Sequence, residues 1–479
     1  MRRIKRKKKK FIIKNILSLV VFIILFLAVF QVFKLNVLPT KYLILFVLIE
    51  TILFVGAFLL YNARKKVLVI IGIILYILVI TANLLGYHYI SKINSYIDNV
   101  FNQETYKIET EYIVIASAKS SISTLDGITD ADQVEYYKYS RSIDKALKQI
   151  GKKNLVSVDS VIKSMRQIKE DQNKYLLIAR ANFDYVFESS NIELINKDDF
   201  KIIHSFVVTD EIKTNKETPD TFNIYINGLD FTGIMRDYNL IATVNMKTRR
   251  VVLTSIPRDY YIDVPAYNIK DTLMCLGSLD PEVSKEALEK LLDIKIDYTI
   301  NLNTNSLVDV VDSLGGIEYC SEYDFITTHA MVLNTFDDTK GKKLHVTKGC
   351  KKYNGIQILV IARERNAFPG RDRYRQKNCR EILISIIDKL ASTTTLSNYT
   401  EVLDSLEGLY TTDMNQKTLK KLIKKVIDGN KFEIIEQSLN GTDMIGVGHL
   451  GTEESWIMVP DEQTVIEAKN TIKKIQKGK

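Results

Sequence analysis

Hydrophobic residues concentrate in three long runs at the start of the chain. The runs cover roughly Phe11–Phe33, Tyr42–Tyr61 and Val67–Ile90. Each run is long enough to cross about 30 Å of hydrocarbon as a helix, so the pattern predicts three transmembrane helices within residues 11–90. A secretory leader is the alternative for the first run. That run is too long for a leader, and no small-residue cleavage site follows Phe33.

Basic residues at the ends of these runs predict their orientation. Residues 1–10 hold eight Lys or Arg, and the connector 62–66 between the second and third runs holds three. Because positively charged loops stay in the cytoplasm, this basic tail and this connector are expected inside the cell. Three crossings then place the chain from about residue 91 onward outside the cell.

The positive charge of the chain belongs to this anchor. Residues 1–66 carry 14 Lys or Arg and a single acid, a net charge of +13. The whole chain carries +9, so the remaining 413 residues sum to −4. The excess of basic residues therefore indicates a membrane anchor and does not support nucleic-acid binding.

The periodicity beyond the anchor predicts two domains. In residues 91–212 we expect a small α/β accessory domain, in which no set of residues typical of catalysis is found. Its expected strands are Tyr106–Ser117, Lys174–Ala181 and Ile202–Val208, and its expected helices are Asp132–Ile150 and Val158–Asp171. The polar segment Lys213–Pro219 marks the boundary to a second domain, residues 218–475.

Alternating strands and helices in the second domain predict an α/β fold, an α-β-α sandwich around a mixed sheet. The expected strands are Phe222–Asn227, Leu240–Asn245, Val251–Ile256 and Tyr298–Leu302. The expected helices are Glu282–Ile294, Asn305–Leu314, Tyr353–Arg363 and Arg375–Leu390.

Charged residues stand at the ends of three of these strands. Asp230 follows the first strand, Asp237 precedes the second, and Arg258 follows the third. Ligands of open α/β sheets collect at strand ends, and two aspartates brought together by one loop could hold Mg²⁺ through oxygen ligands. Aspartates near turns also serve as caps and turn-formers, and this spacing alone does not separate the two roles.

Arginine is concentrated in residues 363–375, which read RERNAFPGRDRYR. Five guanidinium groups this close repel one another unless an anion lies among them, and arginine suits bidentate binding of phosphate oxygens. A solvated basic loop is the alternative, and anion binding is favoured because this run is expected outside the cell and no other arginine-rich run follows the anchor. The arginines are Arg363, Arg365, Arg371, Arg373 and Arg375.

The four cysteines do not show the spacing of a metal site. They are Cys275, Cys320, Cys350 and Cys379. Cys320 and Cys350 flank a candidate loop and are the best-placed pair for a disulfide. Free thiols are the other interpretation, and the one that the sequence favours.

Several of these segments together resemble the LytR-CpsA-Psr (LCP) family. The similar stretches are NIYINGLD, MRDYNLIATVN, VVLTSIPRDYYIDV, LVDVVDSLGGIE and ARERNAFPGRDRYRQKN, in this order between residues 221 and 390. The three spans and the accessory domain are similar to the capsule-type branch of that family. Residues 396–473 look like the C-terminal extension of that branch.

The resemblance implies a phosphotransferase of the Gram-positive cell envelope. It would move an anionic polysaccharide or teichoic-acid-like polymer from undecaprenyl pyrophosphate to peptidoglycan, with Mg²⁺ as cofactor. Matched by motif, Asp230 and Asp237 correspond to metal-binding acids and Arg258 to a catalytic arginine. Asp237 could also take the proton of the acceptor hydroxyl. The residues expected to bind pyrophosphate are Arg258, Arg363, Arg365, Arg373 and Arg375.

The sequence departs from the family pattern at three places. Cys379 stands where the family usually has Gln, Met235 where it has the Arg of an RSD-type triplet, and Asp271 where it has Lys. These departures keep a second interpretation open, a divergent, non-catalytic protein that binds lipid pyrophosphate or regulates assembly of wall polymers. A transcription attenuator is disfavoured because only residues 1–10 and 62–66 are expected in the cytoplasm.

Overall fold

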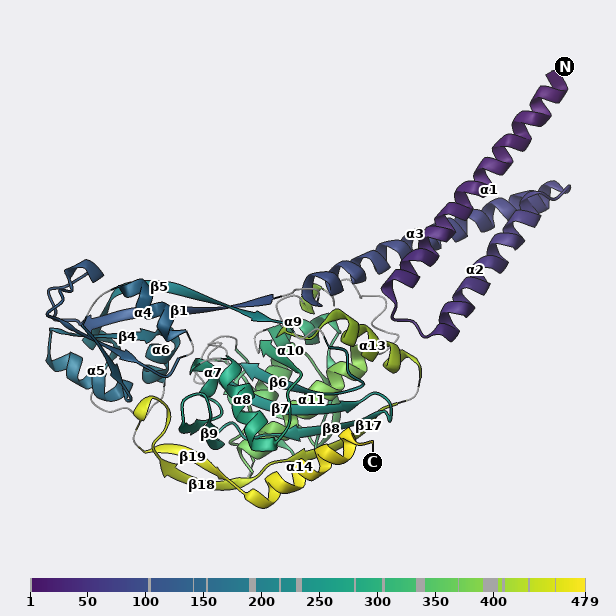
Figure 1. Ribbon diagram of the computed structural model, residues 1–479. Coiled ribbons are helices and arrows are strands. Elements are labelled where there is room, and N and C mark those ends of the chain that lie inside the picture. Colours follow the sequence, from purple (N-terminus) through teal and green to yellow (C-terminus); the bar gives the residue numbers. More distant parts are fainter. Residues whose placement is uncertain are drawn as a thin grey trace. The chain divides into compact units, whose positions relative to one another are not determined.

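The computed structural model describes most of the chain, which divides into two compact units. The described residues are 2–101, 105–140, 142–151, 154–188, 195–214, 217–229, 235–279, 281–303, 306–332, 341–368, 370–390, 404–406, 410–429, 431–452 and 454–478. One unit comprises Met1–Gln103 and Asn415–Phe432, and the other comprises Glu104–Met414 and Glu433–Lys479. Figure 1 shows the elements of both units.

The first unit holds the three predicted apolar helices, α1 (Arg2–Leu35), α2 (Thr40–Tyr61) and α3 (Lys66–Phe101). All three are long and apolar enough to cross a membrane. Helices α2 and α3 cross closely at Gly72, where a Cβ would lie 2.4 Å from the backbone N of Tyr61. Small residues let membrane helices approach in this way. The same unit also contains α13 (Gln416–Ile427), which is not one of the predicted membrane spans and lies far from them in the sequence.

The second unit begins with the accessory domain. A five-stranded sheet of order β3-β2-β4-β1-β5 carries helices on its faces. Its alternating residues pack on both sides, Ile113 and Ile115 with Met165 on one face, and Tyr112 and Val114 on the other. The elements are β1 (Thr105–Ser117), β2 (Gln133–Tyr137), α4 (Ile143–Ile150), β3 (Asn154–Val158), α5 (Val161–Glu170), β4 (Lys174–Ala179), α6 (Arg180–Glu188) and β5 (Phe200–Lys213).

The prediction of one helix over Asp132–Ile150 is wrong in its first half. Residues 133–137 form the inner strand β2, which pairs in parallel with β3 and β4. The segment reads QVEYY, and its β-branched and aromatic side chains suit a half-buried pleated surface better than a helix.

The second domain is built on a six-stranded mixed sheet of order β16-β11-β6-β7-β8-β17. Strands β6, β7 and β8 form an antiparallel meander, while β11 and β17 run parallel to their neighbours β6 and β8. This confirms the predicted mixed sheet. The strands are β6 (Thr221–Leu229), β7 (Arg236–Asn245), β8 (Arg250–Ser255), β11 (Tyr298–Asn303), β16 (Tyr410–Thr412) and β17 (Glu433–Ser438).

Helices cover both faces of this sheet. Thr254 and Ser255 alternate on β8, so their side chains point to opposite faces. Gln437 bridges Thr254 to α14, and Arg380 of α11 donates to Ser255, which places α14 and α11 on opposite sides. The helices are α7 (Leu276–Leu279), α8 (Pro281–Leu292), α9 (Ser306–Ser313), α10 (Gly355–Arg363), α11 (Asp372–Leu390) and α14 (Glu462–Gln476).

Four two-stranded ribbons complete the domain. They are β9–β10 (Tyr261–Val264, Ile269–Thr272), β12–β15 (Ile317–Ser321, Gly349–Tyr353), β13–β14 (Phe325–Ala330, Lys343–Val346) and β18–β19 (Gly441–Gly446, Ser455–Pro460). Helix α10 starts two residues after the predicted Tyr353, because that residue still pairs with Ile317 and Asn354 caps the helix by accepting from the Gln357 N–H.

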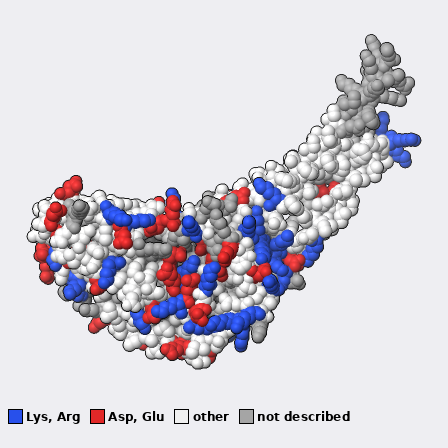
Figure 2. All heavy atoms as spheres, in the orientation of Figure 1, with Lys and Arg blue, Asp and Glu red and all other residues white. Residues whose placement is uncertain are grey.

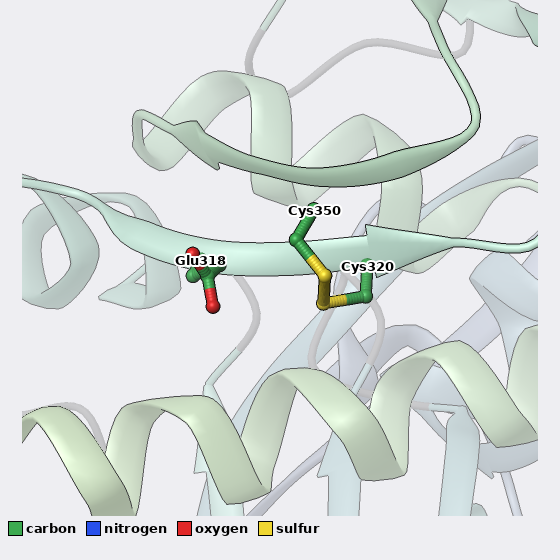
Figure 3. A group of neighbouring side chains, drawn as sticks. All are labelled: Glu318, Cys320 and Cys350. Carbon is green, nitrogen blue, oxygen red and sulfur yellow. A yellow bond between two sulfur atoms is a disulfide. The ribbon is translucent and has the colours of Figure 1, made fainter.

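A disulfide joins Cys320 to Cys350, as Figure 3 shows. The two residues lie directly opposite each other on β12 and β15, with Cα atoms 3.9 Å apart. The expectation of free thiols is therefore wrong for this pair, and it holds for Cys275 and Cys379. Glu318 lies close to both sulfurs, but the disulfide uses the thiolates that a metal would need.

Loss of this disulfide should destabilise the ribbon. The cysteines are 30 residues apart, and the loop-closure entropy of a loop of that length corresponds to about 3–4 kcal/mol. We expect the double variant Cys320→Ser/Cys350→Ser to unfold at lower denaturant than the parent chain. Dithiothreitol should lower the midpoint of the parent and leave that of the variant unchanged. Equal midpoints for parent and variant would contradict a structural disulfide.

Candidate active site at the ends of strands β7 and β8

The meander brings two of the predicted charged residues together. Strand β7 begins at Arg236-Asp237, and β8 is followed by Pro257-Arg258. Because the two strands are antiparallel, with Leu240 opposite Ser255, the start of β7 lies beside the end of β8. The proline cannot donate to the ladder and ends it there.

Asp237 is the residue on which the polar contacts converge. Arg258 Nη1 donates to its Oδ1 at 2.5 Å, and Arg375 Nη1 donates to its Oδ2 at 3.3 Å. Arg375 Nη2 and Gln376 Nε2 donate to its backbone oxygen at 3.2 and 3.1 Å. The side chain of Arg375 is 6% exposed and that of Asp237 is 33% exposed. Arg375 is therefore buried, while Asp237 remains accessible to solvent on part of its surface.

Further charges surround this centre. Arg258 Nε lies 3.4 Å from Asp259 Oδ1, and Arg375 forms an ion pair with Asp372 within the first turn of α11. Arg365 follows the end of α10 and is half-buried. Among the residues that the structure describes, no acid lies within ion-pair distance of Arg365.

The electrostatics of the cluster favour a bound anion. Burial alone would raise the pKa of Asp237, but Arg258 and Arg375 outweigh it and hold that pKa well below its ordinary value. Burial lowers the pKa of Arg365, and the positive charges of Arg258 and Arg375 lower it further. A guanidinium repelled by its neighbours gains most when an anion enters, which makes Arg365 a candidate anion contact.

The other predicted residues are placed differently. Asp230 lies outside the described residues. Arg363 is the last residue of α10 and is half-buried, and no described residue forms a hydrogen bond or ion pair with its guanidinium. Arg373 donates to the backbone oxygen of Gly441 at 2.9 Å and so points to β18 instead of Asp237.

The loop between α10 and α11 is held in place by a buried acid. Glu364 is fully buried, and its carboxylate accepts from the N–H groups of Thr328 and Ala367. Charge-assisted bonds of this kind are strong, so they fix the backbone next to Arg365.

Two members of the cluster were missed at the sequence level. Gln376 contacts the backbone of Asp237, and Asp259 contacts Arg258. A signal for both existed, since each directly follows a predicted arginine.

The residues that depart from the family pattern have structural roles. Cys379 donates to the backbone oxygen of Ala362 at 3.3 Å, which fastens α11 to α10. Asp271 is buried and bonded to His449 Nδ1 at 2.6 Å, so it holds the C-terminal extension. Met235 packs against the large hydrophobic core, and Arg236, which follows it, lies against Gly277 of α7.

Carboxylates near Arg258 and Arg375 offer oxygens of the kind that Mg²⁺ binds, although the described residues with three ligand atoms within 4.8 Å of one another are Glu318, Cys320 and Cys350. Asp237, Asp259 and Asp372 supply hard carboxylate oxygens in one cluster, and such oxygens are the ligands that Mg²⁺ prefers. Both carboxylate oxygens of Asp372 are buried without a hydrogen bond from any described residue, although its Oδ1 pairs with Arg375.

A buried arginine and carboxylate cluster on an α/β sheet, in a chain with three helices apolar enough to cross a membrane, defines a membrane protein with a charged site at the strand ends. The chain belongs to the LytR_cpsA_psr family, which it matches over residues 190–474.

Two curated relatives carry the name polyisoprenyl-teichoic acid–peptidoglycan teichoic acid transferase. TagU of Enterococcus faecalis is 26% identical over 217 residues, which are 44% of this chain and 67% of the relative. TagT of Bacillus subtilis is 27% identical over 195 residues, which are 39% of this chain and 58% of the relative. Among solved structures, protein gbs0355 of Streptococcus agalactiae is 25% identical with a TM-score of 0.45, covering 54% of this chain and 89% of that one.

Proposed function

We propose that this protein transfers an anionic glycopolymer from a polyprenyl diphosphate carrier to peptidoglycan. The observation that carries the proposal is the convergence of Arg258 and Arg375 on Asp237, with Arg365 beside them. Phosphoryl transfer needs little covalent chemistry from the protein and depends on positioning and charge stabilisation, which such a cluster supplies. The named relatives act on teichoic acid and peptidoglycan, which supports the same substrate class here.

In this proposal the arginines bind the diphosphate and the acids order the arginines. The acceptor hydroxyl oxygen attacks the phosphorus that bears the polymer, and the P–O bond to the carrier phosphate breaks. Polyprenyl monophosphate leaves, and the polymer is joined to peptidoglycan by a phosphodiester. The negative charge that develops falls on oxygens facing Arg258, Arg365 and Arg375.

The proton of the acceptor hydroxyl is proposed to go to Asp259. A general base works best when its pKa lies near the operating pH. The pKa of Asp237 is held low by two arginines, which makes it a poor proton acceptor. Burial raises the pKa of Asp259 above its ordinary value, so that carboxylate is the stronger base.

We propose Mg²⁺ as the cofactor, held by Asp237 with Asp372. When bound, it would neutralise charge on the diphosphate oxygens. The predicted ligand Asp230 stays a proposal. We also propose that residues from about 91 onward face the outside of the cell, as the basic residues of 1–10 and 62–66 predict.

Removing divalent metal should stop the reaction. With the full chain in detergent and a polyprenyl diphosphate-linked polymer, we expect EDTA to reduce release of polyprenyl monophosphate to background and excess Mg²⁺ to restore it. Metal-independent turnover would exclude Mg²⁺ as the cofactor and would not affect the proposed role of the arginines. Tight binding of the diphosphate without any turnover, with or without metal, would favour a binding or regulatory protein instead.

A further inference from the structure

Helix α13 has the pattern of a helix that lies along a membrane surface. It reads QKTLKKLIKKVI and contains five lysines and no acid. The lysines fall on one side of the helix at positions 417, 420, 421, 424 and 425, and the apolar residues 419, 422, 423 and 426 fall on the other. Basic amphipathic helices of this kind bind in the plane of anionic bilayers.

The structure places α13 at one end of the membrane helices. Lys41, in the first turn of α2, forms an ion pair of 3.0 Å with Asp428, which follows α13, and also donates to its backbone oxygen at 2.9 Å. Gln416, in the first turn of α13, donates to Asp98 near the end of α3. These contacts hold α13 where α2 begins and α3 ends, the level at which a span leaves the hydrocarbon.

Positive charge accumulates at this end of the bundle. Figure 2 shows Lys and Arg side chains gathered where Figure 1 draws α13. The pKa of Lys420 is lowered, first by burial and then by Lys34 in the last turn of α1, while Asp98 opposes this. Lys420 and Lys34 therefore lie close enough to repel each other, and a bound anion would relieve this repulsion.

The apolar side of α13 is only partly covered by protein. Val426 is 46% exposed and Ile427 is 38% exposed. These two exposed apolar side chains at the C-terminal end of α13, next to three transmembrane helices, are suited to the boundary between headgroups and acyl chains.

We propose that α13 docks on the surface of the bilayer and binds the phosphate groups of anionic phospholipids through its lysines, with its apolar side in the acyl boundary. The phosphate chemistry could also come from the glycopolymer itself. The contacts to α2 and α3 favour the lipid source, because they fix the helix at headgroup level.

The test uses the full chain in nanodiscs and follows hydrogen–deuterium exchange of residues 416–427. We expect these amides to exchange at least fivefold more slowly in discs containing phosphatidylglycerol than in discs of phosphatidylcholine with the same acyl chains. The difference should shrink at high salt, because the attraction to an anionic surface is screened. Exchange in α14 serves as the internal reference and should not depend on the lipid.

Matched variants separate charge from fold. The triple change Lys417→Gln/Lys420→Gln/Lys424→Gln keeps good helix formers and should abolish the lipid dependence. The control Lys469→Gln/Lys474→Gln/Lys477→Gln removes the same charge from α14 and its C-terminal end and should keep it. Equal exchange in both lipids, or a lipid effect that survives in the α13 variant, would overturn the proposal. Protection of α13 by soluble poly(glycerol phosphate) in phosphatidylcholine discs, without an effect of phosphatidylglycerol, would assign the lysines to the polymer and also overturn it.

Discussion

Replacing Arg258 with alanine should lower kcat for polymer transfer by about 10²–10³-fold, the usual effect of removing one group that stabilises transition-state charge. Arg258 is placed by the end of β8 and held by Asp237 and Asp259, so its guanidinium is ordered before substrate arrives. Release of polyprenyl monophosphate from a lipid-linked polymer measures the loss. Binding of the diphosphate should weaken far less than kcat falls, because Arg365 and Arg375 remain.

The companion variant Arg258→Lys tests whether charge alone is sufficient. The planar guanidinium of arginine can contact Asp237 and a phosphate oxygen at the same time, and the ammonium of lysine cannot. We therefore expect Arg258→Lys to regain only a small part of the activity. Full activity in Arg258→Ala would exclude the residue from the chemistry and would leave the convergence on Asp237 without a catalytic role.

Replacing Asp237 with asparagine should remove transfer and also destabilise the domain. The change leaves Arg258 and Arg375 without their shared carboxylate, and an uncompensated buried charge typically costs 3–5 kcal/mol. Since Asp237 is partly exposed, we discount this to about 2–3 kcal/mol at pH 7. The midpoint of chemical unfolding measures the loss.

The pH dependence of this difference has a defined sign. The folded-state pKa of Asp237 is depressed, so its contribution is present above the ordinary aspartate pKa of about 4 and is lost as pH falls through the lower, folded value. Parent and variant should therefore differ by a constant amount between about pH 5 and 8 and converge only in acid. The exposed Asp293→Asn is the control and should leave the midpoint nearly unchanged at every pH. A variant as stable as the parent at pH 7 would show that the arginines do not depend on Asp237.

The membrane helices could be predicted because continuous apolar runs of their length are rare outside membrane spans. The end of α3 could not. The sequence turns polar after Ile90, yet the helix continues to Phe101. Its buried residues Asn94, Ile97 and Phe101 recur at spacings of three and four, a helical period carried by too few apolar residues to be recognised.

The positions of Asp237 and Arg258 at strand ends could be predicted, because alternating apolar residues mark the strands. That the two strands are antiparallel neighbours is known only from the structure. The position of Arg373 could not be predicted from the sequence. Helix α11 starts at Asp372, three residues earlier than predicted, so Arg373 and Arg375 both lie on it. Residues two apart on a helix face different sides, so only Arg375 reaches Asp237.

The disulfide could not be predicted because it depends on the register between two strands. Cys320 and Cys350 are joined because β12 and β15 pair residue for residue, and neither strand was expected from the pattern. A shift of one residue would have turned one cysteine to the other face of the ribbon.

The most direct measurement of the central claim is a structure of the protein with a short polyprenyl diphosphate bound. The account predicts diphosphate oxygens at about 2.7–2.9 Å from guanidinium nitrogens of Arg365 and of Arg258 or Arg375, the distance of a charge-assisted bond. A diphosphate bound elsewhere, with the arginines around Asp237 unchanged and Arg365 turned to solvent, would contradict it.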